Sequence, residues 1–266
     1  MGVVNATPDS FYADSRKQTE TDIANRVEQI LTEGGTIVDV GACSTRPGAL
    51  IASEEEEMSR LRFALAVVRH VAPDAVVSID TFRPAIARMS VEEFGADIIN
   101  DVGGVALMSS DHSNLHADQQ PMFRMVSRLR VPYIYMSSQS TMGDIMLECA
   151  AAVDSLRSMG QKDIILDPGF GFGKTLEQNY KVYRELDRLQ TLELPVLVGI
   201  SRKSMIFKLL QTDPLQALNG TTVLNTVALL KGASILRVHD VREAVECVKI
   251  VGMLHTENVT LITENN

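Results

Sequence analysis

The hydrophobic pattern of the chain alternates short apolar runs with longer amphipathic stretches. Eight runs are rich in β-branched and other apolar residues at successive positions, as expected for parallel strands that are buried on both faces. These runs are residues 1–6, 36–41, 75–80, 96–101, 131–136, 163–167, 194–199 and 233–238. The pattern therefore predicts eight buried parallel strands.

The stretches between these runs carry the start and stop signals of helices. Three stretches begin with Ser, Thr or Asp three residues before Glu or Gln, which is the spacing of a capping box. These pairs are Ser53 with Glu56, Thr175 with Gln178 and Asp240 with Glu243. Glycines at 34–35, 95 and 160 stand where other stretches end, a position that favours a left-handed helix cap.

Eight strand–helix units in 266 residues predict an α/β fold, a (β/α)8 TIM barrel that forms a single domain over residues 1–266. Segment 202–232 is long enough for two helices divided near 212–214, so we expect an extra helix after the seventh strand. A doubly wound open sheet is the alternative, and the number of units favours the closed barrel.

Polar residues stand at the ends of seven of the eight predicted strands, where parallel α/β folds place their chemistry. They are Asn5, Thr45, Arg46, Asp80, Asn100, Asp101, Asp167, Ser201, Arg202, Lys203, Arg237 and His239. A single member could cap a helix, and Asp101 before its glycines could form a turn. Their recurrence favours a shared site, with Asp39 inside its strand as a buried support.

The candidate site residues divide into two chemical groups. Asp80, Asn100 and Asp167 offer acceptors and an amide, which suit a flat heterocycle rich in N–H donors. The second group is cationic and, on a chain of net charge −9, predicts the capture of a phosphate or diphosphate. It comprises Arg46, Arg202, Lys203, Arg237 and His239. Asn5 could supply an oxygen ligand to Mg²⁺, which favours phosphate partners.

The composition excludes several classes of protein. With 25 basic and 34 acidic residues the chain repels polyanions, so we expect no nucleic-acid partner. No apolar run approaches the ~20 residues of a membrane span, and no secretory signal opens the chain. Cys43, Cys149 and Cys247 fit neither a disulfide framework nor a zinc site, so we expect a cytoplasmic protein.

The glycine-rich segment 167–175 looks superficially like a nucleotide-binding loop. A Walker A loop requires a glycine five positions before Gly173, and Pro168 stands there instead. We interpret the glycines as positions where the backbone passes close to a flat ligand, with Phe170 or Phe172 available for stacking. The segment does not indicate an ATPase.

Taken together, seven motifs resemble, in order, those of the dihydropteroate synthase family. They are MGVVNATPDSF, CSTRPGA, SIDT, INDVGG, DPGFGFGKT, GISRKS and LRVHDV, and they extend from residue 1 to about 250. The resemblance implies a transferase of folate biosynthesis that joins 4-aminobenzoate to 6-hydroxymethyl-7,8-dihydropterin diphosphate, giving 7,8-dihydropteroate and diphosphate with Mg²⁺. It also implies a homodimer and a pocket for 4-aminobenzoate in which sulfonamides compete.

The resemblance assigns a role to each matching residue. The pterin ring would be held by Asp80, Asn100, Asp167 and Lys203. The diphosphate and its metal would be held by Asn5, Arg237 and His239, with Asn5 as the metal ligand. The Thr45–Arg46 loop would close over the reacting centre, and Phe172 and Ser201 would help form the aminobenzoate pocket. Of these residues, Thr45, Arg46, Asp80, Lys203, Arg237 and His239 would be catalytic.

Departures from the family pattern leave two alternatives open. Ala13 stands where the family usually has a loop acid, and the fifth strand ends in Tyr135-Met136 where the family usually has His-Met. Segment 136–142, which follows, is also shorter than usual and could reshape one wall of the pocket. A catalytically silent paralogue that binds pterin is therefore one alternative. The other is a pterin-dependent methyltransferase, which would not need a diphosphate site.

Overall fold

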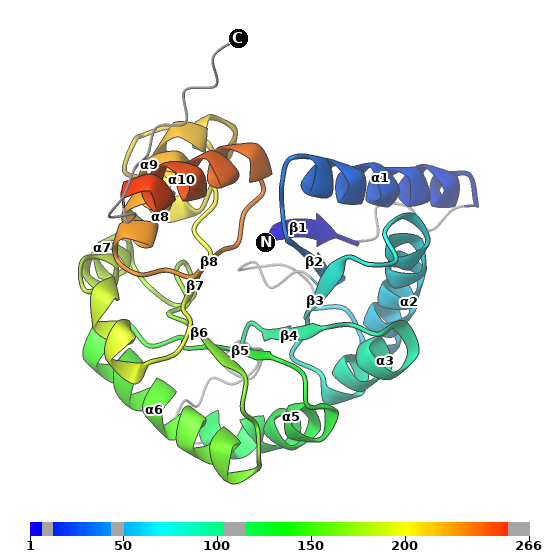
Figure 1. Ribbon diagram of the computed structural model, residues 1–266, viewed down its shortest axis with the longest axis horizontal. Helices are drawn as coiled ribbons and strands as arrows, with labels where there is room; N and C mark the ends of the chain where they lie inside the picture. Colours follow the sequence, from blue (N-terminus) through cyan, green and yellow to red (C-terminus); the bar gives the residue numbers. More distant parts are fainter. Residues whose placement is uncertain (7–12, 44–50, 104–114, 255–266) are drawn as a thin grey trace.

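Eight parallel strands form a closed ring in the computed structural model, which describes residues 1–6, 13–43, 51–103 and 115–254 (Figure 1). The strands are β1 (Gly2–Asn5), β2 (Ile37–Gly41), β3 (Val76–Asp80), β4 (Ile98–Asp101), β5 (Tyr133–Met136), β6 (Ile164–Asp167), β7 (Leu197–Val198) and β8 (Ile235–Leu236). The first six pair in chain order as one sheet, and β7 pairs with β8. Parallel bridges Leu166–Val196 and Gly2–Val238 join these two sheets, so the barrel closes.

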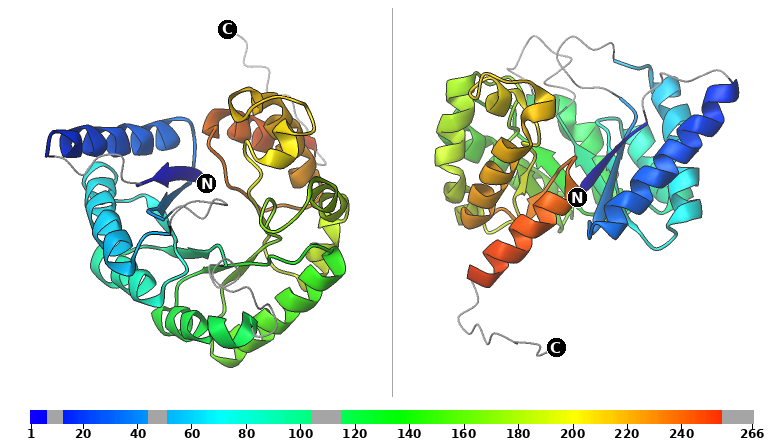
Figure 2. Two further views of the ribbon diagram at one scale, coloured as in Figure 1. Left: turned by 180° about the vertical axis from the view of Figure 1, so that it is seen from behind. Right: turned by 90° about the horizontal axis from the view of Figure 1, so that it is seen from above.

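Helices surround the ring of strands on its outer side (Figures 1 and 2). The α-helices of the described residues are α1 (Ala13–Thr32), α2 (Glu54–Val71), α3 (Pro84–Phe94), α5 (Leu115–Leu129), α6 (Met142–Ser158), α7 (Leu176–Arg184), α8 (Ser204–Phe207), α9 (Leu218–Leu230) and α10 (Val241–Leu254). Two 3₁₀ helices, η2 (Leu186–Leu192) and η3 (Pro214–Gln216), complete them. None of the helices within the described ranges is long and apolar enough to cross a membrane.

The local signals in the sequence correspond to real helix ends. Ser53 and Thr175 each form a complete capping box, so the helices α2 and α7 begin where the sequence predicts. The predicted break in segment 202–232 is also confirmed, because η3 separates α8 from α9. The carboxylate of Asp213 caps η3 through the backbone N–H groups of Leu215 and Gln216.

The last two strands are shorter than predicted, with two residues each. At the start of the seventh run, Pro195 has no N–H to donate to a ladder, although its carbonyl accepts a hydrogen bond from Leu166 at 2.9 Å. Backbone hydrogen bonds outside these short strands complete the closure, such as Arg237 N–H to the Val198 carbonyl at 3.0 Å and Val3 N–H to the Val238 carbonyl at 3.1 Å.

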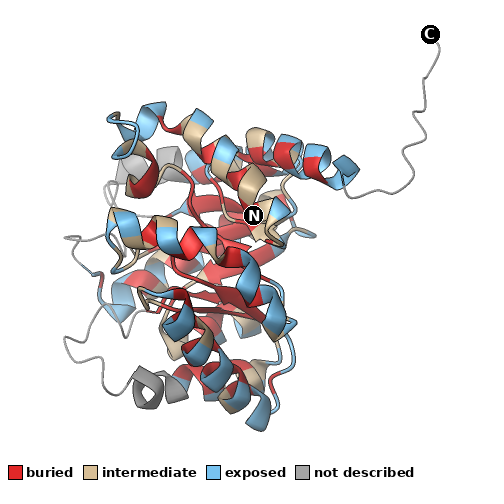
Figure 3. Cartoon of the chain, turned by 90° about the vertical axis from the view of Figure 1, so that its left-hand side faces the viewer, coloured by how far each residue is buried: buried red, intermediate tan, exposed pale blue. Residues whose placement is uncertain are grey.

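Buried residues lie along the strands and on parts of the helices (Figure 3), and the apolar ones form two layers. The larger layer lies between the strands and the helices, and the smaller one fills the base of the barrel. The base consists of Met1, Ile98, Ile134, Ile165 and Leu197, with Ile37 and Ile235 packed against it. Because side chains alternate along a strand, the residue two positions later on each strand points into the barrel above this base.

Candidate active site

A layer of polar side chains lies directly above the apolar base of the barrel. Each polar residue follows a base residue by two positions: Asp39 after Ile37, Asn100 after Ile98, Asp167 after Ile165 and Arg237 after Ile235. The strand register also aligns Asn5, Gly41, Asp80 and Asn100 in one row at the carboxyl ends. The fold thus brings together, from distant parts of the sequence, side chains that were predicted to form one site.

Arg237 links two carboxylates across the barrel. Its Nε lies 2.6 Å from Asp39 Oδ2, and its Nη2 lies 2.6 Å from Asp80 Oδ2. Burial lowers the pKa of Arg237, but the two carboxylates outweigh this effect and raise it, so the guanidinium stays charged. No described residue accepts a hydrogen bond from its Nη1. Arg237 can therefore pair with Asp39 and Asp80 and still donate a hydrogen bond to an anionic ligand.

Asp39 is a buried support, as the sequence suggested. Its side chain is fully buried and accepts a hydrogen bond from Ser78 Oγ at 2.6 Å. The amide nitrogen of Asn100 lies 3.3 Å from both of its carboxylate oxygens. This contact fixes which way the Asn100 amide points, and its buried Oδ1 has no hydrogen-bond partner within the described ranges. Asn100 Oδ1 is thus an acceptor that a ligand N–H could satisfy.

Asp80 titrates near neutral pH. Burial is the main cause that raises the pKa of Asp80 to about 7; Arg237 opposes the shift, and the carboxylates of Asp39 and Glu57 add to it. A group with such a pKa at the mouth of a barrel is a typical feature of a functional site. Its ionised form accepts hydrogen bonds and is favoured above about pH 7.

Asp167, at the end of β6, is joined to the glycines of the segment that follows it. Asp167 Oδ1 accepts a hydrogen bond from the Gly169 N–H at 2.7 Å, and burial raises the pKa of Asp167. Gly169 has φ +67°, and a Cβ there would lie 2.1 Å from the carbonyl oxygen of Ser137. Only glycine allows this close approach between the loop and the end of β5.

Lys203 lies across the glycine-rich segment. Its ammonium donates a hydrogen bond to the Phe170 carbonyl at 2.5 Å and lies 4.5 Å from the centre of the Phe172 ring. Burial lowers the pKa of Lys203 to about 8, and Asp167 partly opposes this shift. The predicted pterin ligand Lys203 and the predicted aminobenzoate ligand Phe172 are therefore neighbours.

A second lysine, Lys174, also holds this segment and was missed in the sequence. Its ammonium donates hydrogen bonds to the carbonyls of Gly169 at 2.9 Å and Phe172 at 3.4 Å. Burial lowers the pKa of Lys174 to about 8, opposed by the charges of Asp167 and Glu148. Its position just after three alternating glycines is the one signal that could have indicated this role.

Ser201 and His239 meet where β7 and β8 end. The Ser201 hydroxyl oxygen accepts a hydrogen bond from the His239 backbone N–H at 3.2 Å and lies 3.0 Å from its ring Nδ1. Arg202, between Ser201 and Lys203, does not join the cationic group expected from the sequence. Its guanidinium instead pairs with Asp240, because a left-handed φ of 53° directs its side chain away from its neighbours.

Comparison with known proteins gives the family. The profile of a family described as pterin binding enzymes matches residues 1–239. The chain belongs to this family. The dihydropteroate synthase of Escherichia coli K12 is 35% identical over 257 residues, which cover 94% of this chain and 89% of that protein.

Solved structures of the same family agree with the fold. A dihydropteroate synthase from Clostridium difficile, crystallised in the presence of pteroic acid, has a TM-score of 0.83 at 30% identity, covering 96% of this chain and 95% of that one. The Xanthomonas albilineans enzyme with 4-aminobenzoic acid has a TM-score of 0.79 at 30% identity, covering 97% and 93%. The resemblance read from the motifs and the (β/α)8 barrel are both confirmed.

The departures from the pterin-binding family pattern fall largely outside the polar layer. The Tyr135 ring packs edge-on against Phe123 of α5, 5.9 Å between centroids, so it lies between the strands and the helices. The side chain of Met136 approaches Gly103 and Gly169 and thus faces the site. Ala13 begins α1.

The other residues predicted from the sequence lie as follows. Asp101 accepts hydrogen bonds from the Gly103 N–H at 2.9 Å and the Tyr133 hydroxyl at 2.7 Å, so turn chemistry is the correct interpretation. Asn5 ends β1, and its side chain is exposed. Thr45 and Arg46 lie outside the described residues.

Proposed function

We propose that this chain is a dihydropteroate synthase, a transferase that joins 4-aminobenzoate to 6-hydroxymethyl-7,8-dihydropterin diphosphate in folate biosynthesis. The observation that carries the proposal is the polar layer of Asp39, Asn100, Asp167 and Arg237 above the barrel base. Membership of the pterin-binding family supports it.

The acceptors of the polar layer suit the pterin. A dihydropterin presents several N–H donors along one edge of a flat ring. Asn100 Oδ1 is buried without a described partner, and the carboxylates of Asp80 and Asp167 point into the same barrel. Hydrogen bonds from the pterin to these oxygens would satisfy both partners, which is why a buried acceptor of this kind favours such a ligand.

The cations of the polar layer suit the diphosphate. Two carboxylates keep Arg237 charged, and His239 follows it by two positions in the sequence. Both residues come directly after β8, which the Gly2–Val238 bridge connects to β1 and so to Asn5. The pterin methylene would then lie between the acceptors and the cations.

The described residues fit a Mg²⁺ ion that binds together with the substrate diphosphate, not one that the protein holds alone. Within the described residues no three His, Cys, Asp or Glu side chains gather into a metal site, and the accessible oxygen ligand is the amide of Asn5. Mg²⁺ usually keeps several waters and binds through substrate phosphates. Asn5 would hold it, and when bound it would neutralise charge on the leaving diphosphate.

The reaction needs no nucleophile from the protein. The bond between the pterin methylene carbon and the diphosphate oxygen breaks, and its electron pair leaves with the diphosphate. The amine of 4-aminobenzoate then forms the carbon–nitrogen bond and loses a proton. Arg237 and His239 stabilise the charge that develops on the leaving group, while the pterin ring and the carboxylate of Asp80 stabilise the carbon.

The second substrate would bind beside the glycine-rich segment. Phe172 and Ser201 are its expected contacts, and Lys203 lies over the Phe172 ring. Thr45 and Arg46 would close over the reacting centre and exclude water, which would otherwise capture the pterin cation.

The proposal extends to the whole molecule. Residues 1–266 would form one domain that works as a cytoplasmic homodimer. Apolar side chains exposed on α9 and α10 support a second copy as the partner, and the absence of a described disulfide suits a reducing compartment.

A test in cells follows from this function. Expression of the chain in a bacterium that lacks its own dihydropteroate synthase should restore growth without supplied folate products. The Asp167→Asn variant, expressed to the same level, should fail to do so, because an acceptor of the pterin becomes a donor. No growth with the unaltered chain would favour the silent paralogue, and growth with both would remove Asp167 from the site.

A further inference from the structure

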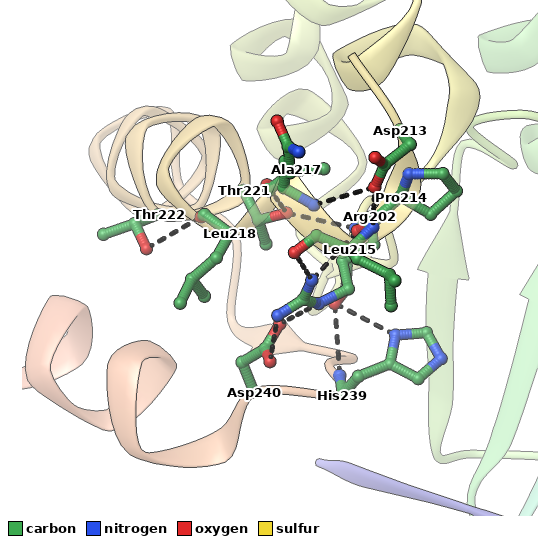
Figure 4. A network of polar contacts seen from close by, with 12 residues as sticks. Arg202, Asp213, Pro214, Leu215, Ala217, Leu218, Thr221, Thr222, His239 and Asp240 are labelled. Atoms are coloured by element: carbon green, nitrogen blue, oxygen red, sulfur yellow. Dashed lines mark hydrogen bonds and ion pairs between the residues drawn. The ribbon is translucent and has the colours of Figure 1, made fainter.

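We propose that Arg202 and Asp240 are positioning residues for His239, which they hold at the mouth of the barrel where the diphosphate binds. This inference rests on the proposed function, because that function assigns the diphosphate to His239. Arg202 is thus not a phosphate ligand itself. It acts through the polar network shown in Figure 4.

Protein acceptors bind all three nitrogens of the Arg202 guanidinium. Its Nε and Nη2 bind the two carboxylate oxygens of Asp240 at 2.8 and 2.9 Å, a bidentate geometry that fixes orientation as well as distance. Its Nη1 donates to the carbonyls of Pro214 and Leu215 at 2.9 and 2.6 Å. One side chain thereby ties the end of β7 to η3 and to the residue after His239.

The backbone of Arg202 explains why its side chain leaves the barrel. With φ at 53°, it is one of the few non-glycine residues in the left-handed region, and its N–H is held by Thr221 Oγ1 at 3.0 Å. On either side of it, Ser201 contacts the His239 ring and Lys203 contacts the Phe170 carbonyl. The ion pair with Asp240 stabilises this unusual conformation.

His239 is held from two directions. On the β7 side, the Ser201 hydroxyl contacts both its backbone N–H and its ring. On the β1 side, Arg26 of α1 donates from Nη2 to the His239 carbonyl at 2.6 Å and from Nε to the Val3 carbonyl at 3.1 Å. The ring orientation is therefore set by contacts of the backbone as well as of the imidazole.

Side-chain contacts continue the connection between β7 and β8 beyond their backbone ladder. The strands pair in register at Leu197–Ile235 and Val198–Leu236, and the Arg237 N–H donates to the Val198 carbonyl at 3.0 Å. Beyond them, the pairs Ser201–His239 and Arg202–Asp240 continue the connection by side chains. Loss of the ion pair should displace His239 and leave the pterin acceptors on β3, β4 and β6 in place.

The test compares two ligands that differ only in the diphosphate. Arg202→Met and Asp240→Asn should each weaken binding of 6-hydroxymethyl-7,8-dihydropterin diphosphate about tenfold, and change the affinity for the free alcohol less than about twofold. Asp187→Asn is the matched control, because it breaks an exposed pair with Lys231 in the helical layer. Equal losses for both ligands, or no loss for either, would overturn the proposal.

Ser201→Ala provides a second variant with a smaller change of volume. Because Ser201 is also an expected contact of 4-aminobenzoate, KM for that substrate can change in any case, and the proposal expects weaker binding of the diphosphate ligand in addition. An unchanged affinity for the diphosphate ligand would contradict it. An unaltered protein that does not prefer the diphosphate over the alcohol would contradict the proposed function itself. If the unaltered protein shows that preference and Arg202→Met keeps it, only the present inference fails.

Discussion

At the residue scale, the site depends on charges that are held in pairs inside the barrel. Arg237 would be costly to bury alone, and so would Asp39, whose side chain is fully buried. Joined to each other and to Asp80, they form a layer that is stable without ligand and keeps donors and acceptors in fixed places. The apolar base beneath the layer excludes water from below.

The pH dependence of folding should report the burial of Asp80. Its pKa is about 7 in the folded protein against 3.8 for the free side chain, so between these values the folded state holds a proton that the unfolded state has released. Raising the pH from 5 to 7 should therefore lower the free energy of unfolding by about 2 kcal/mol. Denaturant titrations of Asp80→Asn should lack this component, and parallel pH curves for the two proteins would contradict the assignment.

Arg237→Ala should weaken both pterin ligands, because it removes the partner of Asp39 and Asp80 as well as a contact for the diphosphate. We expect a loss of about 100-fold for the diphosphate and about tenfold for the alcohol by titration calorimetry. Asp167→Asn is the comparison, since it should weaken the two ligands equally. A larger loss for the alcohol than for the diphosphate would remove Arg237 from the cationic half of the site.

At the element scale, the glycine-rich segment after β6 is held by two ammonium groups and by its close contact with β5. Lys203 was predicted because it follows a strand end in a cluster of polar residues. Lys174 was not predicted, because nothing in the sequence shows that its side chain contacts the carbonyls of Gly169 and Phe172 that precede it. The ion pair of Arg202 with Asp240 was not predicted either, because the sequence does not reveal the left-handed φ of Arg202 or the direction of its side chain.

Lys174→Met should loosen this segment and with it Phe172. We expect KM for 4-aminobenzoate to rise about tenfold, with affinity for the pterin diphosphate changed less than about twofold. Lys181→Met, which makes the same change at an exposed position of α7, should leave both values as they are. The account of Lys174 is wrong if the pterin affinity falls and KM for 4-aminobenzoate stays constant.

At the scale of the whole molecule, the sequence was sufficient for the barrel. Apolar runs separated by capped helices predicted all eight strands, and the polar residues at the strand ends were predicted to share one site. The apolar base beneath them became visible only in the structure. What the sequence could not predict either is which polar residues bind each other across the barrel, such as Asp39 with Arg237, 198 residues apart. Those pairings form only when closure of the barrel brings the first and last strands together.

The late helices expose apolar faces that we expect to lie in a homodimer. Ile250, Met253 and Leu254 lie on one face of α10, and Val223 and Leu230 on one face of α9, all at least half exposed. Ile250→Glu should shift the protein from dimer to monomer in sedimentation equilibrium. Leu147→Glu on α6 is the control, and a monomeric unaltered protein would contradict the expectation.

The release of diphosphate tests the central claim most directly. Purified protein is incubated with 6-hydroxymethyl-7,8-dihydropterin diphosphate and Mg²⁺, with and without 4-aminobenzoate, and diphosphate and dihydropteroate are measured together. A dihydropteroate synthase should release diphosphate much faster with 4-aminobenzoate and form one dihydropteroate for each diphosphate released. Binding of the pterin diphosphate without formation of dihydropteroate would contradict the account and identify a silent pterin-binding protein.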